Sequence, residues 1–91
     1  MLRKEDLFKK NHILGIEFDR YVLENPELLE RIPDGAEILF LPEDDPELCE
    51  ENARLARTHR EEGRPIVIIK IERLEPPRSR LVNVRIESEV A

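Results

Sequence analysis

Four carboxylates lie within eight residues of this chain, in the segment LPEDDPEL at positions 41–48. Carboxylate oxygens are ligands that Mg²⁺ and Mn²⁺ accept, usually one or two of them together with several waters. In a metal site of this kind Asp44 and Asp45 would bind the ion, and Glu43 would support them or act as a base. No other segment of the sequence looks more like an active site.

The same segment also has the pattern of a helix start. Asp45 directly precedes Pro46. An Asp side chain often caps the start of a helix, and proline is favoured at the first helical position. Glu47 would lie in the first turn, where the partial positive charge of the helix terminus favours an acidic side chain. The helix start then explains every carboxylate of the segment except Glu43 and Asp44. We therefore favour the helix start over the metal site.

Arginines form the second candidate site. Arg78 and Arg80 lie in the segment PPRSR after a predicted strand, and Arg73 lies just before it. They could bind an anion or RNA phosphate, an acidic segment of a partner, or the carboxylates of the acidic loop. We predict that they neutralise Glu43 and Asp44, as the ion-pair networks of charge-rich proteins do.

Other groups that could do chemistry are scarce. His12 and His59 are the two histidines, one on each long predicted helix and not at the spacing of zinc ligands. Cys49 has acidic neighbours, which disfavour a reactive thiolate. The three glycines do not form the Gly-rich loop that phosphate-binding motifs need. We therefore predict no catalytic residues, no metal and no cofactor.

Hydrophobic periodicity predicts the elements that position these groups. The predicted fold class is α/β, in a small domain that resembles α+β proteins. This single domain spans residues 1–91. Proline and glycine at the ends of the periodic segments mark where elements stop. The predicted elements are a helix over 4–24, a short helix over 26–31, a strand over 36–41, a helix over 46–62, and strands over 66–73 and 80–87.

The central strand, helix and strand make a right-handed βαβ unit with parallel strands. Ligands of such units bind beyond the carboxyl ends of the strands, where the acidic loop lies. Over 80–87, Val82, Val84 and Ile86 alternate with polar residues, which predicts a half-exposed edge strand. This strand could pair with its own sheet or with that of a partner. Because so thin a sheet has open edges, we expect a homo-oligomer, most simply a dimer.

Composition limits the setting and the partners. Charged residues make up 40% of the chain and the net charge is −6, which makes nucleic acid an improbable partner. The single cysteine predicts a cytoplasmic protein without disulfides, and no segment has the length of a membrane span. The charge-rich composition resembles that of hyperthermophile proteins.

Three segments, IPDGA, FLPEDDPEL and PPRSRL, resemble those of a family of short bacterial and archaeal proteins of unknown function. The resemblance covers the chain from about Glu17 to Leu81. It implies a prokaryotic cytoplasmic protein and a single domain. It transfers no catalytic residue to this sequence.

These observations favour a non-enzymatic protein-interaction or regulatory module that acts as a homo-oligomer. One concrete version is an acidic, antitoxin-like component that masks a basic protein partner. The alternative is a small metal-dependent hydrolase that uses the acidic loop, with Arg78 or Arg80 stabilising charge. RNA binding through the arginines is the third hypothesis.

Overall fold

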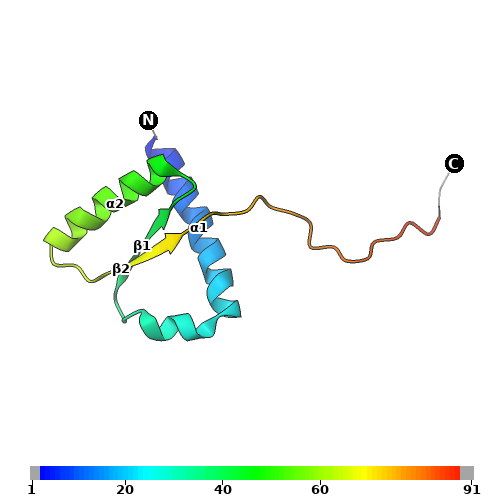
Figure 1. The fold of residues 1–91 in the computed structure, drawn as a ribbon, viewed down its shortest axis with the longest axis horizontal. Helices are drawn as coiled ribbons and strands as arrows, with labels where there is room; N and C mark the ends of the chain where they lie inside the picture. Colours follow the sequence, from blue (N-terminus) through cyan, green and yellow to red (C-terminus); the bar gives the residue numbers. More distant parts are fainter. Residues whose placement is uncertain (1–2, 89–91) are drawn as a thin grey trace.

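The computed structural model describes residues 3–88 and confirms a mixed fold of helices and parallel strands (Figure 1). An N-terminal helix and a short helix precede two strands that are joined by a second long helix. In chain order the elements are helix α1 (Lys4–Glu24), the 3-10 helix η1 (Pro26–Arg31), strand β1 (Glu37–Pro42), helix α2 (Pro46–Glu61) and strand β2 (Ile66–Ile71). None of the described helices is long and apolar enough to span a membrane.

Helix α1 ends because its capping residue is followed by a proline. The backbone N–H of Asn25 donates to the carbonyl of Tyr21 at 2.9 Å, which closes the last turn. Pro26 has no N–H to continue the ladder and begins η1. Helix α2 ends in front of Gly63, whose φ of 78° suits glycine and turns the chain toward β2.

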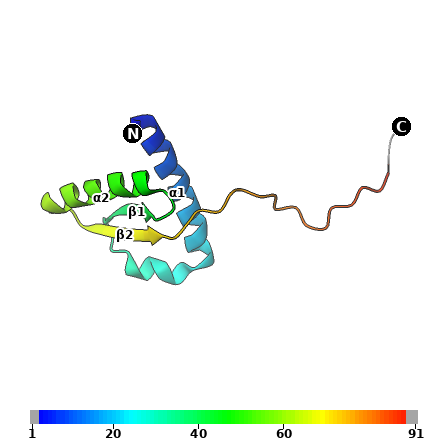
Figure 2. The same ribbon diagram turned by 45° about the horizontal axis from the view of Figure 1, so that its top comes forward.

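The sheet consists of β1 and β2 in parallel, with Glu37 opposite Ile66 and Pro42 opposite Ile71. Successive residues of a strand point to opposite faces. On one face, Phe40 meets Phe18 of α1 with ring centroids 5.6 Å apart. On the other face, Glu37 meets His59 of α2. The sheet therefore has α2 on one side and η1 on the other, and α1 runs past the sheet from α2 to η1, as Figure 2 shows.

The core lies between α1, β1 and the start of α2. Its buried members are Leu14, Phe40 and Leu48. Side chains from α1 and both strands pack around them while remaining partly exposed. These are Leu7, Phe18, Ile38, Ile69 and Ile71.

A pair of asparagines joins the two long helices. Asn52 of α2 is 1% exposed, and its side-chain amide donates to Asn11 Oδ1 at 2.8 Å and to the carbonyl of Phe40 at 2.9 Å. Asn11 Nδ2 donates back to Asn52 Oδ1 at 3.1 Å. Because a buried polar group is costly without partners, these bonds make Asn52 compatible with the core.

The C-terminal edge strand predicted over 80–87 is not formed within the chain. Residues 72–88, which we call the arm, leave the end of β2 as an extended segment without regular structure (Figure 1). Two physical reasons apply. Pro76 and Pro77 hold the chain extended and lead it away from the sheet, and Asn83 adopts a left-handed φ of 49°, which interrupts a strand.

Candidate functional site

The acidic loop starts helix α2, as the capping pattern predicted. Asp45 Oδ1 accepts from the backbone N–H of Leu48 at 3.3 Å, and Pro46 occupies the first helical position. Asp45 Oδ2 also accepts from Lys10 Nζ of α1 at 2.7 Å. This bond from Lys10 holds the pKa of Asp45 below its usual range, and the N–H of Leu48 acts in the same direction. The same bond raises the pKa of Lys10.

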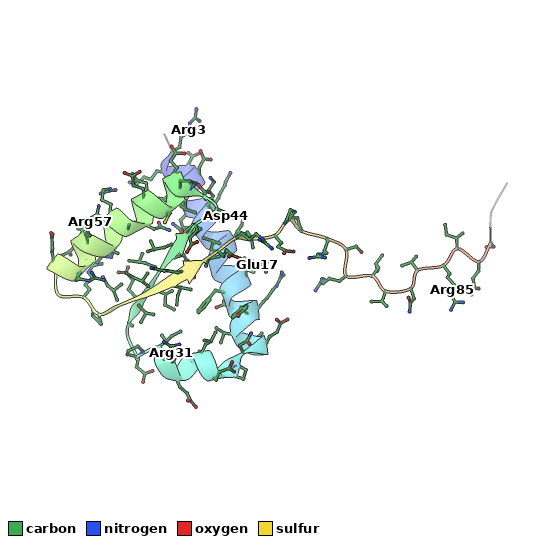
Figure 3. The ribbon with its side chains drawn as sticks, in the orientation of Figure 1. Arg3, Glu17, Arg31, Asp44, Arg57 and Arg85 are labelled. Atoms are coloured by element: carbon green, nitrogen blue, oxygen red, sulfur yellow. The ribbon has the colours of Figure 1, made fainter. Side chains whose placement is uncertain are left out.

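Asp44 connects the loop to the arm. Its Oδ2 accepts from the backbone N–H of Leu74 at 3.0 Å, just beyond the end of β2. Figure 3 shows Asp44 at the point where the arm leaves the body. The side chain of Glu43 is exposed and has no hydrogen bond or ion pair within residues 3–88, while its backbone N–H donates to Ile71 O at 2.7 Å. Two of the three candidate carboxylates therefore hold structural elements together.

The carboxylates of this loop are the candidate ligands for a metal ion. Within residues 3–88, no group of three or more His, Cys, Asp or Glu side chains converges as metal ligands would. Asp45 Oδ2 already accepts from the ammonium of Lys10, and Asp44 Oδ2 from the N–H of Leu74, so a cation at either oxygen would compete with that donor. Asp44 and Asp45 thus already accept from donors of the chain itself, whereas the side chain of Glu43 has no such donor within residues 3–88.

The arginines do not reach the acidic loop. Arg78 pairs with Glu75, and Arg73 lies 3.5 Å from Glu75 and 3.9 Å from Glu72. Arg80 has no ion pair among the described residues. The neutralisation of Glu43 and Asp44 that we predicted is absent, because the arm runs away from the sheet and its arginines meet only neighbours in sequence.

His59 and Cys49 lie on α2 in surroundings without a catalytic arrangement. His59 is half-buried, and its Nδ1 contacts the carboxylate of Glu37 at the start of β1. Cys49 is a free, half-buried cysteine. Neither forms part of a cluster of His, Cys, Asp and Glu in the described chain.

The arm is the feature that sequence reasoning misplaced. Its apolar side chains lie in solvent, with exposed fractions of 75% for Leu81, 78% for Val82, 65% for Val84 and 85% for Ile86. Val82, Val84 and Ile86 have the alternation of a strand but no partner strand within the described chain. Figure 3 shows Arg85 far from the body, on the same extended segment.

Strand β2 is the second unpartnered feature. Glu37 N–H donates to Pro65 O at 2.9 Å, and Glu43 N–H donates to Ile71 O at 2.7 Å. The backbone N–H and C=O groups of the odd-numbered residues of β2 therefore face β1. The backbone groups of Ile66, Ile68 and Lys70 then point outward. No other strand of the described chain pairs with them.

Two open grooves run beside β2, on the face of the sheet that α1 and η1 cover. One has a volume of about 310 Å³, and Leu28 and Ile32 of η1 form part of its wall. The other has a volume of about 520 Å³ and lies between β2 and Tyr21 of α1. Phe18 lines both. The outer side of β2 is therefore flanked by apolar surface.

Comparison with protein families gives one match. A family model described as a family of unknown function, DUF5647, matches residues 6–84. This confirms the resemblance to a family of unknown function over most of the chain. No curated protein and no solved structure matches the sequence.

Proposed function

The chain belongs to the DUF5647 family of unknown function, and we propose that it is a non-enzymatic protein-interaction module that acts as a homo-oligomer. The observation that carries the proposal is the arm. Three of its exposed apolar side chains, Val82, Val84 and Ile86, have the alternation of a strand and lie outside the core. Exposed apolar surface that is this concentrated usually marks an interaction site.

The free energies involved favour a partner that offers a strand edge. Full burial of Val82, Val84 and Ile86 would contribute about 5–9 kcal/mol, at about 1.5–3 kcal/mol per side chain. Fixing the backbone of the six residues 81–86 would cost about 6–12 kcal/mol, at about 1–2 kcal/mol per residue. Because apolar burial alone does not exceed this cost, the arm needs backbone hydrogen bonds as well. A sheet edge supplies both.

The acidic surface supports a regulatory version of this function. A net charge of −6 favours a basic protein as an additional partner, as in an antitoxin-like role. The hydrolase alternative has no comparable support, because Asp44 and Asp45 are engaged by Leu74 and Lys10.

The test is the mass of the full chain in solution, compared with two matched variants. Val84→Asn removes an apolar side chain from the arm, whereas Arg85→Asn places the same residue on the other side of the predicted strand. We expect sedimentation equilibrium at about 100 µM to give twice the chain mass of 10.7 kDa for the wild type and for Arg85→Asn. We expect Val84→Asn to shift toward the monomer. A wild type that stays monomeric up to millimolar concentration would overturn the proposal.

A further inference from the structure

We infer that the arm of one copy adds as a strand to the outer edge of β2 in a second copy. This inference rests on the proposed function and names its acceptor site. It joins two features of the same chain that lack a partner, a segment with strand alternation and a strand with one open edge.

The acceptor edge is β2 and not β1. The carbonyl of Phe40 on the outer side of β1 is already bonded to the buried Asn52. Pro42 at the end of β1 has no N–H to offer. On β2 the outward groups of Ile66, Ile68 and Lys70 have no such partner in the described part of the chain.

The composition of β2 fits a central strand. Five of its six residues are apolar, and none of them is fully buried in the single chain. Parallel strands that are apolar on both faces usually lie inside a sheet whose two faces are covered. The apolar segment of the arm, residues 81–86, has the same length as β2, so one arm would cover the open edge along its whole length.

The two faces of the arm match the surroundings of β2. In a strand over 81–86, Val82, Val84 and Ile86 lie on one side, and Leu81 lies on the other with the polar Asn83 and Arg85. The grooves lined by α1 and η1 provide apolar surface on one face of the sheet. On the other face α2 packs chiefly against β1, which leaves the polar side of an added strand in water.

Exchange between copies is favoured over a return of the arm to its own β2. A return would reverse the chain within residues 72–79, which contain no Gly, Asn or Asp to form a tight turn. Pro76 and Pro77 favour an extended path there. The structure shows the arm leading outward from the body (Figure 2), where a second molecule can receive it.

Docking as a strand requires Asn83 to leave its left-handed conformation at φ 49°. Asn adopts both conformations at low cost, whereas a β-branched residue strongly prefers the extended one. The substitution Asn83→Thr should therefore tighten the dimer several-fold. A weaker dimer would contradict docking in an extended conformation.

Amide exchange measured by NMR on the full chain tests the acceptor edge directly. In the dimer we expect the outward N–H groups of Ile68 and Lys70 to exchange at least tenfold more slowly than in the monomeric Val84→Asn variant. The inward N–H groups of Val67 and Ile69 are the internal control, because they face β1 in both forms. A dimer whose Ile68 and Lys70 exchange remains fast would overturn the inference while leaving the proposed function intact.

Cross-linking tests whether the arm crosses between copies. Two Cys49→Ser variants, one with Lys70→Cys and one with Asn83→Cys, are mixed and treated with a flexible bismaleimide. We expect a link between residues 70 and 83 of different chains, and far less when Glu61→Cys replaces Lys70→Cys. Slow exchange of Ile68 and Lys70 in a monomer would show that the arm returns to its own β2, and would overturn both proposals.

Discussion

The asparagine pair allows the tightest test of the fold, because an isosteric change removes its donors. Asn52→Asp replaces the amide nitrogen that donates to Asn11 Oδ1 at 2.8 Å and to Phe40 O at 2.9 Å. The shape of the side chain is unchanged. Both acceptors lose their donor, and a carboxylate is introduced at a site that is 1% exposed.

The expected cost follows from which acceptor can reach water. Asn11 is half-buried, so its oxygen can find a water, whereas the carbonyl of Phe40 is bonded to Asn52 in the interior. An unsatisfied buried acceptor costs about 1–3 kcal/mol, and a buried charge adds to it. We expect Asn52→Asp to lower the free energy of unfolding by about 2–4 kcal/mol. The total free energy of unfolding expected for a chain of this size is about 5–14 kcal/mol, so this loss is a large share of it.

The assay is urea denaturation at neutral pH, with two further Asn→Asp variants as a graded series. Asn11→Asp keeps the bond from Asn52 to Phe40, so it should cost less than Asn52→Asp. Asn83→Asp lies in the exposed arm and should change stability by less than about 0.5 kcal/mol. The reasoning would be refuted if Asn52→Asp cost no more than Asn83→Asp, or if Asn11→Asp cost the most.

Four further predictions concern the acidic loop. Asp45→Ala should cost about 1 kcal/mol through the lost cap, and Asp45→Asn less, in urea denaturation at pH 7. The folded pKa of Asp45 is lowered, so its contribution is present above the usual Asp value of 3.8 and is lost as pH falls through the folded pKa. Wild type and Asp45→Asn should therefore converge in stability as the pH falls below the folded pKa. Asp44→Ala should speed exchange of the Leu74 amide, whereas Glu43→Ala should not; equal effects would contradict the bond to Asp44. Millimolar Mg²⁺, Mn²⁺ or Zn²⁺ should leave the melting temperature unchanged, and a stabilisation abolished by Asp44→Ala would restore the metal site.

The sequence correctly predicted the parts of the structure that depend on interactions between residues close together in the chain. The apolar stripe of α1, the Asp45–Pro46 helix start and the βαβ order depend on residues close together in the chain. The bond from Lys10 to Asp45 spans 35 residues, and the Asn11–Asn52 pair spans 41. Their partners depend on how α1 crosses α2, which no local pattern specifies.

The predicted pairing of the arginines with the acidic loop failed for a related reason. It correctly placed the acidic loop beside the end of β2, where Asp44 does meet Leu74. It then assumed that the arm stays close to the sheet. Pro76 and Pro77 direct the arm outward instead, so Arg78 pairs with Glu75 only three residues away.

The missing edge strand has a different cause. The alternation of Val82, Val84 and Ile86 is a property of the sequence, and it persists although the single chain offers the arm no partner. Strand β2 shows the complementary mismatch, since its composition is that of a central strand while its position is at an edge. One added strand between copies would remove both mismatches at once, and two unrelated partners would be needed to remove them separately. A second copy is therefore the simplest occupant of the β2 edge.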